Sequence, residues 1–227
     1  MHIGIVTALD DETIALAGLW NEEGVTVRQA GIGAERAAVT ARDLLDEGCT
    51  ALVSAGICGG LDKSLPPGAL VLAEAVRHPN GEKTLTDLRW RLALTDLLWE
   101  EIPLASGIQW GSDRVVRRVE HKAELAALGH VAVDMESHGV ARVAKAAGVP
   151  FLVLRAVSDP ADTKLPRAAL GGVSPEGHRR PWGVVWGLLK RPNDLGGVLR
   201  LAMDSKKALG TLSRVAAAAG SRGLGLL

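Results

Sequence analysis

The 227-residue sequence has few cysteines, no net charge and no long apolar run. Its two cysteines, Cys49 and Cys58, form no Cys-x-x-C pair and no metal-like pattern with histidine, which favours a reducing cytoplasm over a disulfide scaffold. Lysine plus arginine equals aspartate plus glutamate, at 26 each, so no whole-protein field attracts nucleic acid or anionic lipid. We therefore predict no metal site and no nucleic-acid partner.

No apolar stretch approaches the roughly 18 residues that a membrane-spanning helix needs. The sequence starts with MHIGIVTALDDE, a short apolar run that is stopped by three acids and lacks the basic n-region of a signal peptide. We therefore expect a cytoplasmic protein. If it meets lipid, we expect it to do so as a peripheral protein at the inner face of the membrane.

Short β-rich runs alternate with helical patterns through the first 162 residues. HIGIVTA, TALVSAGICGG and FLVLRAVS are nearly continuous apolar runs, typical of parallel strands that are buried on both faces. The helical patterns between them predict helices on both sides of a sheet. We expect one α/β domain over residues 1–220, a three-layer fold with a largely parallel mixed sheet.

The C-terminal third has a different composition. It starts with a segment rich in proline, glycine and arginine, which predicts a long loop, and continues with a helical pattern broken at Pro192. The apolar residues of the long helix after this break include Leu199, Met203, Ala208 and Leu212. Residues 163–220 are thus predicted as a loop and helical extension, and residues 221–227 as a poorly ordered tail.

Acidic or glycine residues follow four of the predicted strands. These groups are Asp10–Glu12, Gly56–Gly60, Asp134–Glu136 and Ser158–Asp159. In open parallel sheets, ligands bind outside the carboxyl ends of the strands, so the four groups are predicted to converge on one site.

Each group also has a structural alternative. Asp159 taken alone fits equally well as the cap of a following helix or as part of a turn with Pro160. Glu136 fits as a first-turn acid that faces the helix dipole. Glu136 continues the apolar face of the next helix, which consists of Val140, Val143, Ala144 and Ala147. The pair Gly59–Gly60 fits a plain turn, and Met135 fits a core position.

Three segments together resemble a known superfamily. MHIGIVTALDDE, SAGICGGL and AVDMESHGVARVAKAAGVPFLVLRAVSDPAD, in this order, resemble the nucleoside phosphorylases and nucleosidases, in the purine nucleosidase branch. The resemblance covers residues 1–162. It implies a phosphorylase/hydrolase-like fold, an enzyme that cleaves the N-glycosidic bond of a small-molecule nucleoside, a homodimer and no cofactor.

The resemblance also implies roles for individual residues. Asp159 would be the general acid at the purine N7, and Glu12 would orient the attacking water. Glu136 would accept hydrogen bonds from the ribose hydroxyls, and Met135 would pack under the sugar. Val115, Val116 and Ser158 would contact the base, and Gly59 and Ile57 would lie at the pocket for the nucleophile.

The glycine turn departs from the family pattern, which reads Gly-Ser-Ala-Gly-Gly. Here the turn is Gly-Ile-Cys-Gly-Gly, and Ile57 replaces the serine that touches a nucleophile in other members. Arg36 and Arg114 are the candidates for a phosphate site, but neither matches one clearly. The residues therefore favour water as the nucleophile, with inorganic phosphate as the alternative co-substrate.

The C-terminal segment PWGVVWGLLKRPNDLGGVLRLAMDSKKAL, with DMESHGVARVA and SDPAD, resembles the hopanoid-associated phosphorylases, which release adenine from adenosylhopane. On a helix, Trp182, Val185, Trp186 and Leu189 would share one apolar face. That face suits contact of Trp182 and Trp186 with lipid, and it suits a core or dimer-interface helix equally well.

Cleavage of adenosylhopane in hopanoid biosynthesis is therefore the leading prediction. Cleavage of methylthioadenosine, adenosylhomocysteine or futalosine is the alternative within the same chemistry. A catalytically silent nucleoside-binding or membrane-surface module is the alternative from another class. The presence of both Asp159 and Glu12 argues against the silent module, because a binder needs neither a proton donor nor a group that orients water.

Overall fold

A mixed sheet of eight strands forms the centre of the structure, a computed structural model that describes residues 2–20, 22–100, 102–220 and 224. The strands are β1 (Ile3–Thr7), β2 (Val25–Gln29), β3 (Ala51–Gly60), β4 (Leu70–Arg77), β5 (Lys83–Leu85), β6 (Leu104–Gly111), β7 (His130–Asp134) and β8 (Phe151–Asp159). Their order is β2-β1-β3-β7-β6-β4-β5, and β8 pairs with both β3 and β4.

Most strand pairs in the sheet are parallel. The pairs β1–β2, β1–β3, β3–β8, β4–β6 and β6–β7 are parallel, whereas β3–β7, β4–β5 and β4–β8 are antiparallel. Every residue of β8 is buried, as the nearly unbroken apolar run predicts for a strand covered on both faces. The largely parallel mixed sheet is thus confirmed.

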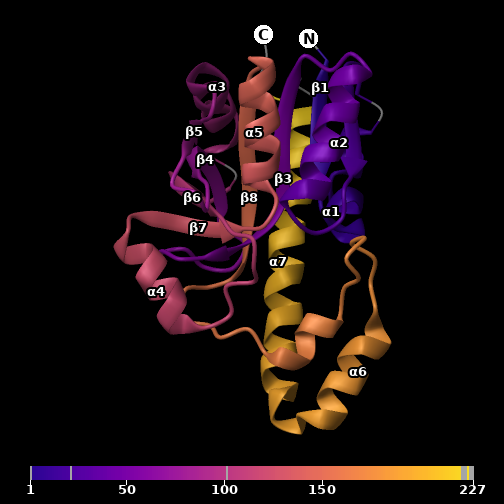
Figure 1. Ribbon diagram of the computed structural model, residues 1–227, viewed down its shortest axis with the longest axis vertical. Helices are drawn as coiled ribbons and strands as arrows, with labels where there is room; N and C mark the ends of the chain where they lie inside the picture. Colours follow the sequence, from indigo (N-terminus) through magenta and orange to yellow (C-terminus); the bar gives the residue numbers. More distant parts are fainter. Residues whose placement is uncertain (1, 21, 101, 221–223, 225–227) are drawn as a thin grey trace.

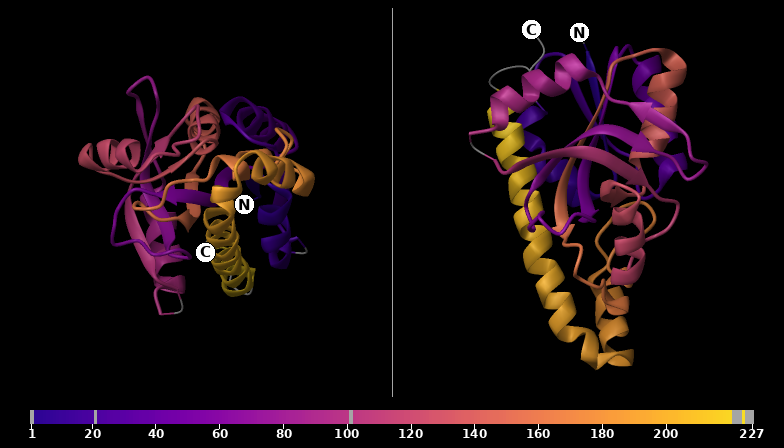
Figure 2. Two further views of the ribbon diagram at one scale, coloured as in Figure 1. Left: turned by 90° about the horizontal axis from the view of Figure 1, so that it is seen from below. Right: turned by 90° about the vertical axis from the view of Figure 1, so that its left-hand side faces the viewer.

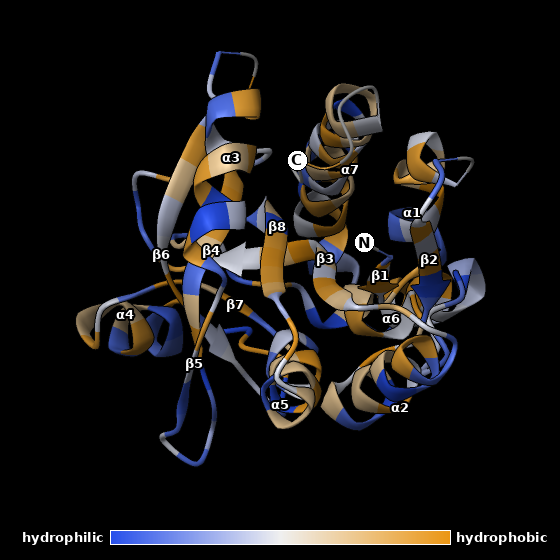
Figure 3. Cartoon of the chain, turned by 90° about the horizontal axis from the view of Figure 1, so that it is seen from above, coloured by the Kyte–Doolittle hydropathy of each residue, from blue (hydrophilic) through white to orange (hydrophobic). Residues whose placement is uncertain are grey.

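Helices cover both faces of the sheet, so the three-layer α/β domain is confirmed (Figure 3). The α-helices are α1 (Asp10–Ala15), α2 (Ala34–Asp46), α3 (Leu88–Leu98), α4 (Val119–Ala127), α5 (Ser137–Ala147), α6 (Pro181–Lys190) and α7 (Leu195–Gly220). Three short 3-10 helices are η1 (Ala17–Leu19), η2 (Arg167–Gly171) and η3 (Pro192–Asp194). Helices α2 and α5 lie on one face, and α1, α3 and α7 lie on the other (Figure 3).

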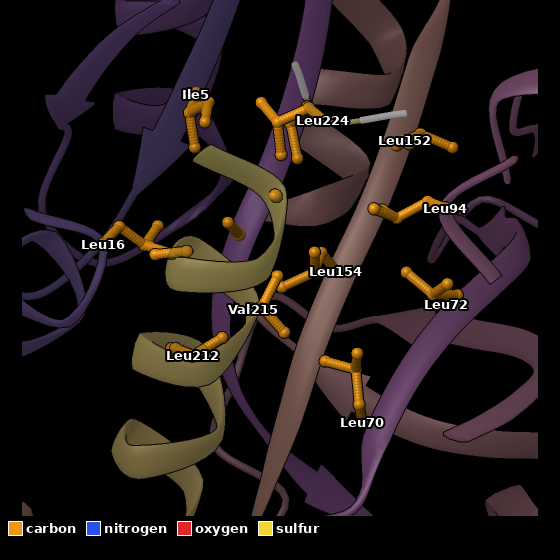
Figure 4. Close-up of a cluster of buried hydrophobic side chains, with 14 of the residues drawn as sticks. Ile5, Leu16, Leu70, Leu72, Leu94, Leu152, Leu154, Leu212, Val215 and Leu224 are labelled. Atoms are coloured by element: carbon orange, nitrogen blue, oxygen red, sulfur yellow. The ribbon is translucent and has the colours of Figure 1, made fainter. Parts of the chain in front are cut away.

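The C-terminal half of α7 belongs to the hydrophobic core. Leu212 and Val215 are fully buried and pack near Leu152 and Leu154 of β8 (Figure 4). Since full burial of one such side chain contributes about 1.5–3 kcal/mol, this half of α7 stabilises the domain substantially.

The N-terminal half of α7 and all of α6 extend beyond the end of the sheet (Figures 1 and 2). Residues 163–220 contain η2, α6, η3 and α7, with loop segments before α6. Ala208 and Leu212 are buried as the helical pattern implied, whereas Leu199 and Met203 are more than half exposed. Helix α6, described over its whole length, buries none of its side chains, so the alternative of a core helix is wrong for α6.

Leu224 is the residue of the predicted tail that the structure describes. Leu224 is buried against the core, and its carbonyl oxygen accepts a hydrogen bond from Trp90 Nε1 at 2.8 Å. The other residues of the predicted tail, 221–223 and 225–227, lie outside the described residues.

Candidate active site

A cavity of about 380 Å³ opens where β1, β3, β7 and β8 end. The nine residues to which the resemblance gives roles line it together: Glu12, Ile57, Gly59, Val115, Val116, Met135, Glu136, Ser158 and Asp159. Trp182 and Trp186 are not among the described residues that line it. The four strand-end groups therefore meet, as expected for the carboxyl edge of a mainly parallel sheet.

Glu12 is held by three backbone donors in the floor of the cavity. Its Oε2 accepts hydrogen bonds from Ala8 N (2.8 Å) and Leu9 N (3.0 Å), and its Oε1 accepts one from Ile57 N (2.8 Å). Burial raises the pKa of Glu12, and the nearby Arg155 guanidinium and these N–H groups oppose the rise. Oε1 accepts only one of these bonds, so it retains a lone pair with which it can orient a water molecule.

Glu136 immediately precedes α5, at its N-cap position, rather than lying in the first turn of the helix. Its Oε1 accepts a hydrogen bond from Gly33 N at 3.0 Å. The cap is supplied by Asp134, whose Oδ1 accepts hydrogen bonds from Glu136 N, Ser137 N and Ser137 Oγ. The alternative of a first-turn acid on the helix dipole is therefore wrong, because the Glu136 carboxylate lines the cavity instead.

The helix after Glu136 matches its predicted apolar face in part. Val140, Val143 and Ala144 are buried, whereas Ala147 in the last turn is exposed. The helix ends where Gly148 adopts φ 67°, a left-handed conformation that glycine tolerates and most residues do not.

Arg155 of β8, which the sequence analysis missed, connects the acids behind the cavity. Its side chain is 1% exposed, its Nε lies 2.8 Å from Asp134 Oδ2, and its Nη2 lies 3.7 Å from Glu136 Oε2. Nη2 also donates to Ser54 Oγ at 2.8 Å. The available signal was a single cation within an apolar strand, since a buried guanidinium needs anionic partners.

A close approach between β3 and these acids requires glycine at position 56. A Cβ built on Gly56 would collide with the carboxylate of Glu12 and would lie 2.5 Å from Arg155 Nη1. Gly56–Gly60 lie within β3, so the alternative of a plain turn at Gly59–Gly60 is wrong. Gly56 is needed for space, which the sequence could not reveal.

Asp159 is the last residue of β8, and both of its carboxylate oxygens contact donors. Ser158 Oγ donates to Oδ1 at 2.8 Å, and Lys122 Nζ of α4 donates to Oδ2 at 2.6 Å. Burial raises the pKa of Asp159, and the Lys122 ammonium and the Ser158 hydroxyl oppose that rise. In the described chain no helix begins between Asp159 and Arg167, so the helix-cap alternative is wrong.

The remaining wall of the cavity is mostly apolar. Val116 is buried and Val115 is half exposed, and Met135 lies beside Glu136. At the far end the wall is formed by the C-terminal extension, with Leu165, Ala169, Leu170, Val173, Leu201, Ser205 and Leu209. This composition suits an apolar group that extends away from the acids.

The two arginine candidates for a phosphate site lie in different places. Arg114 lines the cavity, whereas Arg36 lies outside it and its Nη2 is 3.4 Å from Glu176 Oε1. Among the described residues, no three histidine, cysteine, aspartate or glutamate side chains are grouped so that they could hold a metal ion.

The raised pKa of Glu136 predicts a dependence of stability on pH. Burial raises this pKa from its ordinary value of 4.5 to about 7; the charge of Arg155 opposes the rise, and Asp134 and Glu12 add to it. Between pH 4.5 and pH 7 the folded protein binds a proton at Glu136 that the unfolded chain releases. The contribution of Glu136 to the free energy of unfolding is therefore largest below pH 4.5 and falls as pH rises towards 7. The Glu136 contribution to this loss is roughly 3 kcal/mol.

We expect Glu136→Gln to weaken that fall in the free energy of unfolding, measured by urea titration between about pH 5 and pH 8. The control is Glu35→Gln, because the hydrogen bond with Arg142 lowers the pKa of exposed Glu35. Its effect on the pH dependence of stability therefore falls below pH 4.5. An unchanged slope in Glu136→Gln would contradict the raised pKa.

Comparisons with known proteins agree with this fold and site. The family profile of the Phosphorylase superfamily matches residues 11–189. The chain is 33% identical to a futalosine hydrolase of Streptomyces coelicolor, over 70% of this chain and 84% of that protein. It is 28% identical to a 5'-methylthioadenosine/S-adenosylhomocysteine nucleosidase of Haemophilus ducreyi, over 64% and 71% of the two chains. The solved futalosine hydrolase of Helicobacter pylori superposes with a TM-score of 0.73 at 19% identity and 96% coverage of both chains.

The chain therefore belongs to the phosphorylase superfamily, as its strand-end motifs predicted. Within it, the protein is an enzyme of the nucleosidase and nucleoside phosphorylase class, and the alternative of a catalytically silent module does not apply.

Proposed function

We propose that this enzyme hydrolyses the N-glycosidic bond of an adenine nucleoside whose 5′ substituent is large and apolar, with adenosylhopane as the leading substrate. The carrying observation is that one cavity joins Asp159, Glu12 and Glu136 to an apolar end formed by the C-terminal extension. A ribosyl-adenine has polar groups for the acids, and its 5′ substituent would extend along that apolar end.

In the proposed mechanism the purine N7 receives a proton from Asp159, so that adenine leaves as a neutral base. The electron pair of the C1′–N9 bond moves to the base, and positive charge develops on the ribose. Carboxylates near the ribose stabilise this charge, and Glu136 accepts hydrogen bonds from the ribose hydroxyls. Glu12 orients the water that attacks C1′.

Futalosine, methylthioadenosine or adenosylhomocysteine is the second candidate substrate. It is supported by the similarity to a futalosine hydrolase over 84% of that protein's length and to a methylthioadenosine/adenosylhomocysteine nucleosidase. The chemistry at the three acids would be the same, and only the occupant of the apolar end of the cavity would differ.

The exposed face of α6 supports a further part of the proposal, peripheral contact with a membrane surface. Trp182, Trp186 and Leu189 are 74%, 63% and 69% exposed, and Lys190 and Arg191 follow them. Aromatic and aliphatic groups beside cations suit a lipid–water boundary. No described helix is both long enough and apolar enough to cross a bilayer, so such contact would be peripheral. A homodimer that covers the same face is the competing proposal.

A substrate panel tests the proposal. We expect Trp182→Ser combined with Trp186→Ser to weaken association with liposomes, because both side chains are exposed on α6. We also expect lower adenosylhopane turnover, because a lipid substrate would be taken from the membrane that this face contacts, although neither side chain lines the cavity. Turnover of soluble methylthioadenosine should change much less. Base release is measured for adenosylhopane, futalosine, methylthioadenosine and adenosylhomocysteine.

The matched control is Trp99→Ser, which removes the exposed tryptophan at the C-cap of α3. Helix α3 lies at the opposite end of the molecule from α6 (Figure 1). Equal losses on all substrates with a lower melting temperature or a dissociated dimer would assign the α6 face to assembly. Preference of the wild type for futalosine over adenosylhopane would favour the second candidate substrate.

A further inference from the structure

Lys122 is a fully buried cation that the proposed reaction leaves without a role. It lies in α4, and its side chain is 0% exposed. Its Nζ donates to Asp159 Oδ2 (2.6 Å), to the Asp159 carbonyl oxygen (3.1 Å) and to the Pro160 carbonyl oxygen (2.7 Å). All three N–H groups of the ammonium are thus engaged, and the side chain is fixed at the end of β8.

Stability alone is a weak explanation for this pair. Removing both charges from water costs several kcal/mol per ion, and well-packed apolar residues of similar volume often stabilise a core equally well. Lys122 lies instead at the one carboxylate that the mechanism needs as a proton donor. Its placement therefore points to the chemistry of Asp159.

Ser158 allows Asp159 to take either protonation state. Its Oγ lies 2.8 Å from Asp159 Oδ1 and 3.1 Å from the Cys58 carbonyl oxygen. When Asp159 is ionised, the hydroxyl donates to Oδ1. When Oδ1 carries a proton, the same hydroxyl can accept it and donate to Cys58. In both states the Ser158 hydroxyl and Asp159 Oδ1 are hydrogen-bonded to each other.

Groups on other elements also act on Asp159, and one of them opposes the effect of Lys122. Asp204 of α7 is buried, lies 3.1 Å from Lys207 Nζ and acts on Asp159 in the same direction as burial, raising its pKa. Cys58 of β3 is a neutral thiol, because burial raises its pKa. In the part of the chain that the structure describes, Lys122 is the cation in direct contact with the carboxyl group.

We propose that Lys122 is the positioning residue of the general acid: its ammonium fixes the Asp159 carboxyl and sets the highest pH at which that carboxyl can protonate the leaving base. The inference rests on the proposed function, since it requires Asp159 as the donor. In the step, the O–H bond of Asp159 breaks, the N7–H bond forms, and the C1′–N9 electron pair moves to the base. Lys122 keeps its protons and stabilises the new Asp159 carboxylate. The attacking water loses a proton to solvent as it bonds to C1′, and a proton from solvent returns Asp159 to its acid form.

Lys122→Met tests the proposal, because methionine has a similar length and no charge. We expect the basic limb of the pH profile of kcat/KM to move up by about 1–3 pH units, since an adjacent cation lowers a carboxyl pKa by that amount. The maximal rate should fall, because the carboxyl becomes a weaker acid and is less well fixed. Lys122→Arg, which keeps the charge, should restore the position of the limb.

Two controls separate positioning from a structural role. Lys145→Met removes an exposed lysine that pairs with Glu82, and it should leave the profile unchanged. In the Asp159→Asn background, Lys122→Met should cause little further loss of turnover, because Lys122 acts through Asp159. A Lys122→Met enzyme with a lower melting temperature and rate but an unmoved basic limb overturns the inference.

A measurement on the unsubstituted enzyme remains decisive if Lys122→Met does not fold. The NMR signals of the Asp159 carboxyl carbon and the Lys122 Nζ, assigned with Asp159→Asn and Lys122→Arg, should change at the same pH. A Lys122 Nζ chemical shift that stays constant while the Asp159 carboxyl titrates contradicts the inference. If the wild type releases base from no nucleoside of the panel, the proposed function fails instead.

Discussion

Asp159→Asn is expected to lower kcat for base release by about 10²–10⁴-fold, the usual loss when a general acid is removed. Asparagine has no acidic proton to give to the purine N7. Its carbonyl oxygen can still accept the hydrogen bond of Lys122 or Ser158, so the end of β8 should keep its conformation. Steady-state base release and thermal unfolding, measured on the same preparation, check both expectations.

Asp162→Asn is the matched control for this substitution. Asp162 is exposed, lies three residues further along the chain and does not line the cavity among the described residues. It should therefore retain wild-type turnover. Near-wild-type base release by Asp159→Asn would rule out the proposed mechanism, and loss of folding would show that the carboxylate serves the turn at Pro160.

Glu12→Gln is expected to lower hydrolysis by a similar factor, about 10²–10⁴-fold, and also to lower stability. Glutamine offers one carbonyl oxygen where Glu12 offers two carboxylate oxygens to Ala8 N, Leu9 N and Ile57 N. At least one buried N–H then loses its acceptor, which costs about 1–3 kcal/mol. Base release is measured in phosphate-free buffer, and adenine binding is measured by calorimetry.

The binding measurement separates the two effects. A Glu12→Gln enzyme that binds adenine but does not release base has lost the group that orients water. Asp10→Asn changes a neighbouring acid whose carboxylate faces His178 Nδ1 at 3.0 Å, and it should leave turnover unchanged. Strict dependence of the wild type on phosphate would contradict hydrolysis, and Arg114, which lines the cavity, should then be tested as the phosphate ligand.

The main features of the fold follow from local patterns in the sequence. The nearly unbroken apolar run of β8 predicted a strand buried on both faces, and its residues are all buried. Strand β5 and helix α3 were not predicted, and the three antiparallel pairs depend on tertiary arrangement. Burial of Leu224 also depends on a distant partner, Trp90, which no local pattern reveals.

The acids of the site could be placed from the sequence because each ends or follows a strand, and strand ends meet at one edge of the sheet. Their supports could not be placed in the same way. Asp134, rather than Glu136, accepts the hydrogen bonds that cap α5, and only the positions of the two side chains show which of the acids is the cap. Lys122 appears as an ordinary helix charge, although its spacing of three residues from buried Leu125 puts it on the inward face of α4.

Helix α7 is continuous over 26 residues, yet its two halves serve different purposes. Its C-terminal half fills the core through Leu212 and Val215, while Leu201 in the N-terminal half and Leu209 near the middle line the cavity. Under the proposed function, the α7 residues that contact the 5′ substituent and the α7 residues that fill the core would lie on successive turns of one helix, and Leu209 would belong to both groups. Replacement of Leu201 in the projecting turns would then change the substrates that the enzyme accepts, whereas replacement of Leu212 would lower the stability of the domain.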